Sequence, residues 1–241
     1  MAVQCHSPPI TDDGYMVARE ALVAESLWAR ALKRPFDLIT ALLLVLVLTP
    51  VILLVAAFVK LTSPGPVFFT QTRAGKNGLV FRLVKFRTMR GGRKPDPQEL
   101  VPLHHPDITR LGYVLRRFKL DEVPQLFNVI KGEMSLVGPR PTLPDQVAAY
   151  DDFRRQRLLV RPGITGLAQV YGNSLTPWDE RILYDIAYVR RCGFFLDLSI
   201  LLRTILVVFV GERRMTRPFV ETPFAAFVTQ PDECGLDKSQ I

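Results

Sequence analysis

The sequence predicts an α+β protein, mostly helical and monotopic, meaning that it enters a membrane from one face and returns to that face. Three observations predict this class. Residues 38–59 carry no charged side chain and are long enough to cross a bilayer, but they contain Thr49-Pro50 near their middle. Two β-rich runs surround an Asn-Gly turn signal, and most other apolar residues recur at helical spacing.

Length and composition are those of one ordinary domain with an appendage. The 241 residues carry a net charge of +8, and 22% of them are charged. A basic chain is expected to have anionic partners: phospholipid head groups, nucleotides or nucleic acid, among which composition does not choose. Cys5, Cys192 and Cys234 are far apart and form no CxxC pattern, which indicates a reducing, cytoplasmic setting.

Residues 1–30 are an N-terminal extension that ends in a short amphipathic stretch. This stretch lacks the apolar centre of a secretory signal peptide and carries too many acids for one. We therefore expect a helix that lies on a surface such as the membrane.

Residues 31–62 are expected to form a re-entrant membrane helix. Proline removes a helical hydrogen bond, so Thr49-Pro50 predicts a helix-break-helix, with the Thr49 hydroxyl available to freed backbone groups. Lysine and arginine flank both ends, and the positive-inside rule then places both ends in the cytoplasm. A kinked helix that crosses the bilayer once is the alternative.

A β-hairpin is predicted at residues 67–71 and 79–86. The link Gly75-Lys76-Asn77-Gly78 carries the Asn-Gly signal of a tight turn. Lys85 and Arg87 alternate with apolar residues, so they are either phosphate ligands or the solvent-facing side of a strand.

Two adjacent carboxylates, Asp121 and Glu122, stand at the start of a predicted short helix; we call them the dyad. Asp121 is a good N-cap, Pro124 is tolerated in a first turn, and Gly132 suits a left-handed residue at the C-terminal end. These features also allow a purely structural interpretation, in which the two acids only begin the helix.

Cationic side chains on both sides of the dyad favour an active site. A helix over 110–118, capped by Thr109, brings Arg116 toward the dyad, and Pro139-Arg140-Pro141 follows it. Guanidinium groups hold nearby carboxylates ionised, and the same arrangement can hold a divalent cation and a diphosphate.

Two further helices are predicted, over 143–159 and, capped by Thr176, over 178–191. Between them, 161–170 is a glycine-punctuated turn into an extended segment. Asp185 lies among apolar residues of the second helix, where a carboxylate must be exposed, paired or functional.

Residues 194–211 are strongly apolar but include Asp197 and Arg203, each costly at a bilayer centre. An amphipathic helix in the plane of the interface therefore fits better than a second span. We assign a catalytic domain to 63–211, with its active site on the cytoplasmic side, and a mobile tail to 212–241.

Several motifs occur in an order typical of one family. They are Lys33-Arg34-Pro35-Phe36-Asp37, Phe69-x-Gln-x-Arg-x-Gly75, Lys85-Phe-Arg-Thr-Met89, Leu120-Asp-Glu-x-Pro-Gln-Leu-Phe-Asn-Val129, Val137-Gly-Pro-Arg-Pro141 and Arg161-Pro-Gly-Ile-Thr-Gly-x-Ala-Gln-Val170. With this ordered set the chain resembles the bacterial sugar transferase family, the monotopic polyprenyl-phosphate phosphoglycosyl transferases, in its short catalytic form.

The resemblance implies catalytic roles for Asp121, Glu122 and Arg116, with both carboxylates also as metal ligands. It implies a membrane break at Thr49-Pro50. The substrate-binding residues that it implies are Arg73, Lys85, Arg87, Pro139, Arg140, Pro141 and Asp185. The chain departs from the family pattern at Lys119, where Ser or Thr is often found and would form a capping box, and at Thr49, where Ser is common.

For the activity, the resemblance implies transfer of a sugar 1-phosphate from a UDP-sugar to undecaprenyl phosphate, with Mg²⁺ as cofactor and UMP as the released product. A covalent phospho-sugar intermediate on Asp121 is implied, as is a place on the cytoplasmic face of the bacterial inner membrane beside anionic lipids. The reaction would be the first membrane step toward an exopolysaccharide, lipopolysaccharide, capsule or other glycoconjugate. The sequence leaves open the sugar, the pathway and a homo-oligomer.

Two other classes compete with this interpretation. A membrane-anchored adaptor without catalysis explains the apolar helix and the basic charge, but not a dyad flanked by arginines. A nucleic-acid-binding protein suits the charge, yet the sequence contains no recognised nucleic-acid module and its basic residues lie beside a membrane element. We therefore expect no nucleic-acid partner.

Overall fold

The computed structural model describes residues 26–90, 103, 105–172, 176–211 and 215–228. In this part of the chain the protein is mostly helical with two small sheets, which confirms the predicted class at that level. The helices are α2 (Lys33–Thr62), α3 (Arg110–Arg117), α4 (Gln125–Lys131), α5 (Pro144–Ala148), α6 (Asp152–Arg155), α7 (Leu167–Tyr171), α8 (Trp178–Arg191) and α9 (Phe194–Val210). The strands are β1 (Phe68–Ala74), β2 (Val80–Phe86), β3 (Ser135–Val137) and β4 (Gly163–Thr165). Short π- and 3₁₀-helical turns are η1 (Trp28–Leu32), η2 (Lys76–Gly78), η3 (Leu120–Glu122), η4 (Gln156–Leu159), η5 (Phe219–Glu221) and η6 (Ala225–Phe227).

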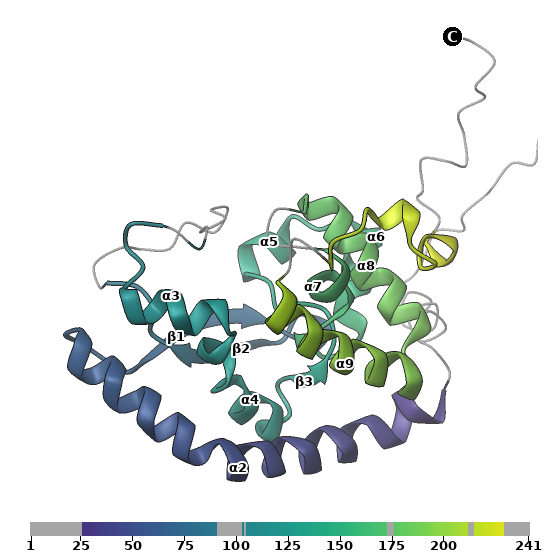
Figure 1. The fold of residues 1–241 in the computed structure, drawn as a ribbon. Coiled ribbons are helices and arrows are strands. Elements are labelled where there is room, and N and C mark those ends of the chain that lie inside the picture. The colour runs from purple at the N-terminus through teal and green to yellow at the C-terminus, as the bar shows by residue number, and fades with distance from the viewer. Residues whose placement is uncertain (1–25, 91–102, 104, 173–175, 212–214, 229–241) are drawn as a thin grey trace, which may run out of the picture.

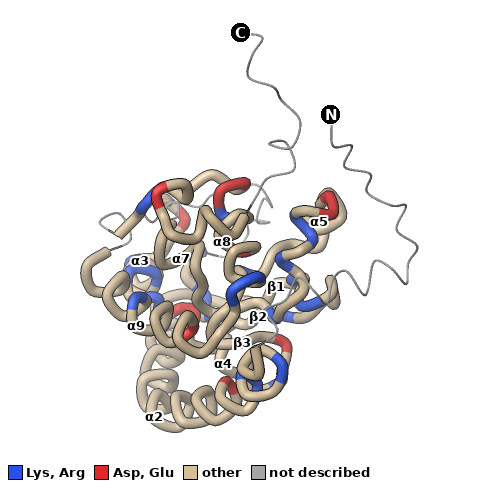
Figure 2. The backbone as a smooth tube through the Cα atoms, turned by 90° about the vertical axis from the view of Figure 1, so that its right-hand side faces the viewer, with Lys and Arg blue, Asp and Glu red and all other residues tan. Residues whose placement is uncertain are grey.

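The longest element, α2, is the apolar helix predicted for the membrane. It runs beneath the rest of the molecule and bends in its middle, so that it curves around the body above it (Figure 1). Its outward side exposes leucine, valine and phenylalanine, and Figure 2 shows most of the helix without charged residues. Among the described residues, Trp28–Thr62 is the one helical stretch long and apolar enough to cross a membrane.

The structure corrects the predicted break at Thr49-Pro50. Pro50 lies inside a continuous helix, and Oγ1 of Thr49 donates to the carbonyl oxygen of Val45 over 2.7 Å. A proline bends a helix without ending it when the neighbouring turns keep their hydrogen bonds. The predicted helix-break-helix is thus one bent helix.

Charged side chains attach the N-terminal half of α2 to the body. Nζ of Lys33 lies 2.6 Å from Oδ2 of Asp197, in the first turn of α9. Asp37 accepts hydrogen bonds from Oγ of Ser135 (2.7 Å) and from the backbone N–H of Leu136 (3.2 Å), both in β3. These bonds fix β3, and the chain that follows it, to α2.

Arg87 holds the other end of α2. Its guanidinium donates to the carbonyl oxygens of Pro64 (2.8 Å) and Ser63 (2.7 Å), just after the last turn. Apolar residues near that end of α2 also pack with residues of β2 and α3. Strand β2 ends at Phe86, so Arg87 lies just beyond it and has this structural role; its predicted substrate contact stays a prediction.

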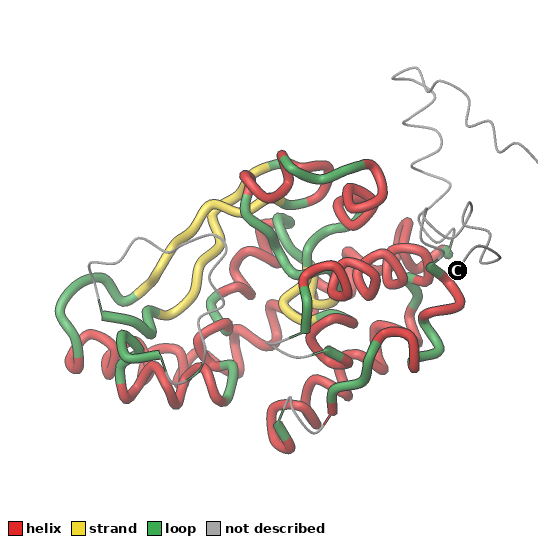
Figure 3. The backbone as a smooth tube through the Cα atoms, turned by 90° about the horizontal axis from the view of Figure 1, so that it is seen from above, coloured by secondary structure: helices red, strands yellow, loops and turns green. Residues whose placement is uncertain are grey.

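The predicted hairpin is confirmed as the antiparallel pair β1–β2, with Phe68 opposite Phe86. Asn77 and Gly78 have φ angles of 56° and 76°, the left-handed conformation that an Asn-Gly turn requires. A second, parallel pair joins β3 to β4, and Figure 3 shows this short pair apart from the long hairpin.

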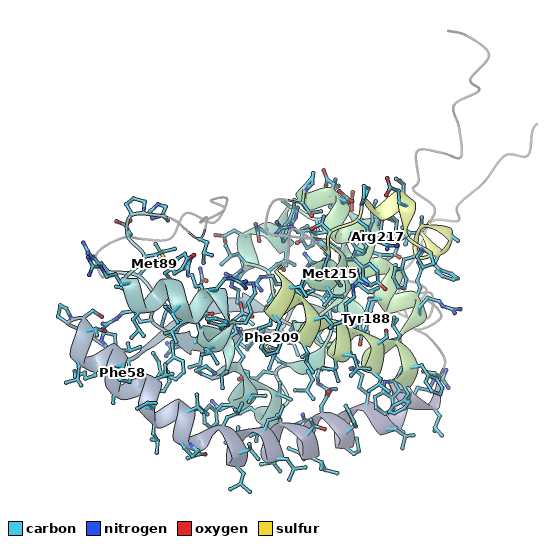
Figure 4. All side chains as sticks on the ribbon, in the orientation of Figure 1. Phe58, Met89, Tyr188, Phe209, Met215 and Arg217 are labelled. Carbon is cyan, nitrogen blue, oxygen red and sulfur yellow. The ribbon has the colours of Figure 1, made fainter. Side chains whose placement is uncertain are left out.

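The core contains the inner sides of α8 and α9, with Tyr188 in the interior (Figure 4). Asp197 accepts from Nε1 of Trp28 (2.8 Å) and from the hydroxyl of Tyr188 (2.7 Å). Arg203 donates to the carbonyl oxygen of Val170 over 2.9 Å. Both charged residues of the predicted interfacial helix are therefore paired inside the body, while its outer side stays apolar and exposed.

The structure differs from the prediction in three helices. The expected helix over 143–159 is divided into α5, α6 and η4. Residues 167–171, expected to be extended, form α7. Helix α8 has the predicted bounds, but Pro177 precedes it and no side chain caps it, so Thr176 is not its cap.

Residues 215–228, which we call the C-terminal segment, correct part of the expected mobile tail. The backbone N–H of Arg217 donates to Tyr171, and the hydroxyl of Tyr184 donates to the carbonyl oxygen of Arg217 over 2.6 Å. Phe219 is buried in the core. This segment, with Met215 and Arg217 in Figure 4, is part of the folded body.

Most of the predicted N-terminal extension and the last part of the predicted tail lie outside the described residues. The end of the extension is described, and there Trp28 packs its ring against Phe36 and Phe194. Trp28 is therefore part of the core.

Candidate active site

The dyad lies in a tight turn between two helices. Helix α3 ends at Arg117, Lys119 takes a left-handed conformation (φ 57°), and the 3₁₀ turn η3 carries Asp121 and Glu122. Both acids are largely buried, with 5% and 9% of their surface exposed. The turn therefore places two carboxylates side by side in a protein interior.

The structure corrects the predicted N-cap at Asp121. Helix α4 begins at Gln125 after Pro124, and no side-chain hydrogen bond caps it. The predicted end is confirmed, because Gly132 is left-handed (φ 88°). Asp121 makes no hydrogen bond within the described part of the chain, so its carboxylate is not committed to holding the helix.

Arg34 helps to hold α4 in place. Its guanidinium donates to the carbonyl oxygens of Val129 (2.6 Å) and Ile130 (2.9 Å) in the last turn of the helix. A cation there compensates the negative end of the helix dipole. The long apolar helix α2 thus contacts the element that follows the dyad.

Glu122 is paired with Arg140. Nη2 of Arg140 lies 3.1 Å from Oε1 of Glu122, and the arginine side chain is 45% exposed. Burial raises the pKa of Glu122, but Arg140, Lys119 and Lys85 outweigh it and hold that pKa below its usual range. Glu122 is therefore an ionised carboxylate beside an accessible cation.

The pKa of Asp121 shifts in the opposite direction, to above its usual range. Burial and the charge of Glu122 raise its pKa, against the influence of Lys85 and Arg116. Two adjacent carboxylates resist double ionisation unless positive charge is near. The dyad is therefore a place where a further cation would be favourable.

Two of the predicted cations approach the dyad from neighbouring elements. Nε of Arg116, in α3, donates to Oγ1 of Thr88 over 2.9 Å, and Arg116 interacts electrostatically with Asp121. Burial lowers the pKa of Lys85, in β2, to about 8, although Glu122 and Asp121 oppose the shift. Arg116 therefore lies where the sequence prediction placed it, toward the dyad, and Lys85, for which the sequence left two interpretations open, is a second cation beside the carboxylates.

Residues 138–142, which we call the Arg140 loop, are held on two sides. Gly138 donates to Thr165 in β4 (2.9 Å), and Ala74 at the end of β1 donates to Thr142 (2.8 Å). Pro139 accepts from the backbone N–H of Gly163 over 2.8 Å. The loop is thus fixed between the two sheets.

Arg73 supports the same loop. Its Nη1 donates to the carbonyl oxygen of Pro141 (3.2 Å) and its Nη2 to Oε1 of Gln71 (2.7 Å). Burial, followed by the charge of Arg140, lowers the pKa of Arg73 to about 10. Arg73 therefore adds a second positive charge close to Arg140.

Asp185 is paired with an arginine inside the folded body. It is 1% exposed, and its Oδ2 accepts from Nη2 of Arg157 over 2.5 Å. The predicted substrate contact of Asp185 stays a prediction. The sequence required Asp185 to be exposed, paired or functional, and the structure shows it paired. Its partner, Arg157, was not among the predicted site residues.

The carboxylates of the dyad fit a magnesium ion. Mg²⁺ is commonly bound through one or two carboxylates together with substrate phosphates and water. The described residues contain no group of three acidic, histidine or cysteine side chains that would form a site from protein ligands alone. Asp121 and Glu122 would therefore hold the ion jointly with a diphosphate.

Comparison with known proteins assigns the chain to a family. The model of the family described as bacterial sugar transferase matches residues 28–211. The chain belongs to the bacterial sugar transferase family. Every residue of the dyad and its cations lies within this match, whereas the C-terminal segment lies beyond it.

Several characterised and uncharacterised members of the bacterial sugar transferase family are similar to this chain. The sugar transferase EpsL of Bacillus subtilis is 42% identical over 187 residues, which are 75% of this chain and 89% of EpsL. The exopolysaccharide production protein ExoY of Rhizobium meliloti is 39% identical over 72% of this chain and 83% of ExoY. The UDP-glucose:undecaprenyl-phosphate glucose-1-phosphate transferase of Caulobacter vibrioides is 40% identical over 72% of this chain and 68% of that enzyme.

Proposed function

We propose that this sugar transferase moves a sugar 1-phosphate from a UDP-sugar to undecaprenyl phosphate and releases UMP. The observation that carries the proposal is the buried dyad with Arg116, Arg140 and Lys85 around it, next to a long apolar helix. Relatives named as undecaprenyl-phosphate sugar phosphotransferases support it. Both substrates are anionic, so a cationic site is what their encounter requires.

In the proposed mechanism, a carboxylate oxygen of Asp121 attacks the β-phosphorus of the UDP-sugar. A bond forms between Asp121 and phosphorus, the bond from this phosphorus to the oxygen bridging the two phosphates breaks, and UMP leaves with that oxygen. An oxygen of undecaprenyl phosphate then attacks the same phosphorus and displaces Asp121 as a free carboxylate. The route has two steps, and the protein carries the sugar phosphate between them.

The surrounding residues supply the charge that this route needs. Arg140 and Arg116 would bind the diphosphate oxygens and stabilise the charge that moves to the leaving UMP. Glu122 stays ionised and holds Arg140 in place. Bound Mg²⁺ would neutralise further phosphate charge at the dyad. Within the described residues, the Asp121 carboxylate has no hydrogen bond to break before it attacks.

We further propose that the protein is monotopic, on the cytoplasmic face of the bacterial inner membrane. The 30 residues of α2 span about 45 Å, more than the hydrocarbon core of a bilayer. Yet Lys33 and Asp37 near one end and Ser63 at the other contact the same folded body. This supports a helix that lies in one leaflet with both ends on one side, beside anionic lipids that match the basic charge.

The proposal is tested by the nucleotide released from the purified protein with Mg²⁺, undecaprenyl phosphate and a panel of UDP-sugars. We expect UMP from one or a few sugars, and no UMP from the Asp121→Asn variant. The Asp145→Asn variant changes an acid in the first turn of α5 and serves as the matched control. Release of UDP would mean ordinary glycosyl transfer, and no nucleotide from any sugar would favour the adaptor without catalysis.

A further inference from the structure

Arg157, in η4, is almost completely buried although it carries a guanidinium group; 2% of its surface is exposed. Its Nη2 donates to the carbonyl oxygen of Arg140 (3.0 Å) and to Oδ2 of Asp185 (2.5 Å). Its Nη1 donates to the hydroxyl of Tyr150 (2.8 Å), and the guanidinium lies 5.1 Å from the ring centre of Trp178. A buried arginine is retained only where such partners compensate its lost hydration.

These contacts connect the dyad to residues far from it. Asp185 in α8 holds Arg157, Arg157 holds the backbone of Arg140, and the Arg140 side chain reaches Glu122 over 3.1 Å. Gly138, Pro139, Pro141 and Thr142 of the Arg140 loop contact other groups, and Arg157 holds the Arg140 carbonyl oxygen. The direction of the Arg140 side chain therefore depends on Arg157.

Arg157 is not placed to touch a sugar nucleotide. The cavity that Arg140 and Arg157 line together has a volume of about 10 Å³. That is room for about one water molecule, far less than the hundreds of cubic ångströms of a small-molecule pocket. Because its contact with the dyad's surroundings is the hydrogen bond to the Arg140 carbonyl oxygen, we expect Arg157 to affect the reaction through Arg140.

We propose that Arg157 is a positioning residue for the transfer reaction, and that Asp185 acts through it. The Asp185–Arg157 ion pair would set the Arg140 loop, so that the Arg140 guanidinium faces both Glu122 and the incoming diphosphate. This inference rests on the proposed function and adds two residues to it.

The first test is the Arg157→Lys variant, which keeps the charge but loses the planar fork that reaches two acceptors. Losing one buried hydrogen bond to a charged group corresponds to roughly a ten- to hundredfold effect, which we expect as a fall in kcat for UMP release. The KM for the UDP-sugar should change by less than about threefold, because the lost interaction orients a group for the transition state. Arg154→Lys alters a surface arginine three residues away and should leave both constants unchanged.

The second test measures coupling. In an Arg140→Ala background, Arg157→Lys should produce no further loss, because the side chain that it positions is gone. Equal losses with and without Arg140 would overturn the proposal, since Arg157 would then act independently of it. The milder Tyr150→Phe variant removes one partner of Arg157 and keeps the buried volume. We expect a smaller loss of kcat with the same dependence on Arg140.

Hydrogen exchange gives a readout that does not need activity. In Arg157→Lys, the amide hydrogens of Gly138, Arg140 and Thr142 should exchange faster than in the wild type, and in Arg154→Lys they should not; Pro139 and Pro141 carry no amide hydrogen. Unchanged exchange in Arg157→Lys would overturn the proposal even if the protein proves inactive on every sugar. If the wild type releases no UMP, the proposed function fails separately, and the exchange result still decides whether Arg157 fixes the Arg140 loop.

Discussion

Nη2 of Arg140 lies 3.1 Å from Oε1 of Glu122, and this contact joins two residues between which the chain forms α4 and β3. It leaves Glu122 ionised and Arg140 partly exposed, while Asp121 next to them has no hydrogen bond among the described residues. The two acids of the dyad therefore differ in role: Glu122 holds a cation, and Asp121 is available for chemistry.

Glu122→Gln should keep the fold and lose most of the activity. The amide cannot hold Arg140 as an ion pair and is a poorer magnesium ligand. We expect kcat for UMP release to fall roughly a hundred- to thousandfold, as when one preorganised charge-stabilising group is removed. We also expect the Mg²⁺ concentration at half-maximal rate to rise. Glu221→Gln, at an exposed acid of the C-terminal segment, is the control, and equal activity of the two variants would contradict this role.

Lys85 should limit activity at alkaline pH. Burial lowers its pKa to about 8, so its ammonium loses its proton as the pH rises past that value and one positive charge at the dyad disappears. For the wild type, kcat/KM should therefore fall above about pH 8, because this ratio reports groups of the free enzyme. Lys85→Arg keeps its charge at these pH values, and its profile should stay flat there. Lys76→Arg, in the hairpin turn, should behave like the wild type; an identical alkaline fall in Lys85→Arg would exclude Lys85 as its cause.

Gly112→Ala should destabilise the contact between α3 and the end of β2. A methyl group on Gly112 would lie 2.0 Å from the carbonyl oxygen of Thr88, so the helix carrying Arg116 must shift. Alanine favours helix by about 1 kcal/mol over glycine, but overpacking of this kind costs typically about 1–3 kcal/mol. We expect a net loss measured by denaturant unfolding in detergent, together with lower activity.

Gly193→Ala is the matched control for that substitution, because the nearest atom to its methyl group would be 3.6 Å away. Its free energy of unfolding should stay within about 0.5 kcal/mol of the wild type. Equal unfolding free energies for Gly112→Ala and Gly193→Ala would contradict the close packing of α3 on β2.

Both ends of α2 should be reached from the cytoplasm. Leu27 and Lys60 are exposed near its two ends, and each can be replaced by cysteine after Cys5 and Cys234 are changed to serine. Cys192 can remain because it is buried. A membrane-impermeant thiol reagent should label both positions in inverted membrane vesicles and neither in intact spheroplasts. Labelling from opposite sides would show a helix that crosses the bilayer.

Local signals in the sequence predicted the elements whose geometry depends on a few neighbouring residues. The Asn77-Gly78 turn, the left-handed Gly132 and the Thr109 cap, whose side chain accepts from the N–H of Gly112, are all confirmed. The dyad and its cations were found for a related reason, because adjacent charges in a short stretch are visible without the fold. From the same local signals we predicted a break at Pro50. The structure has a continuous helix there, because a helix can lose one hydrogen bond and only bend.

The sequence carries no such local signal for contacts between segments that are far apart along the chain. Arg157 and Asp185 are far apart along the chain, and the pattern around Arg157 indicated only the polar side of a helix. Arg87 repeats the spacing of Lys85, but it lies beyond the end of β2 and turns to the carbonyl oxygens that end α2. The C-terminal segment packs partly through backbone bonds to side chains such as Tyr184, and these leave no periodicity in its own sequence.

The central claim, that Asp121 carries the sugar phosphate, is tested most directly in a single turnover without the lipid acceptor. The purified protein, Mg²⁺ and the UDP-sugar selected from the panel are mixed, and UMP and the mass of the intact protein are followed together. We predict up to one UMP per protein and a mass increase of one sugar phosphate, located on the peptide with Asp121 and absent in Asp121→Asn. If UMP appears only after undecaprenyl phosphate is added, and the protein mass does not change, the covalent route is contradicted.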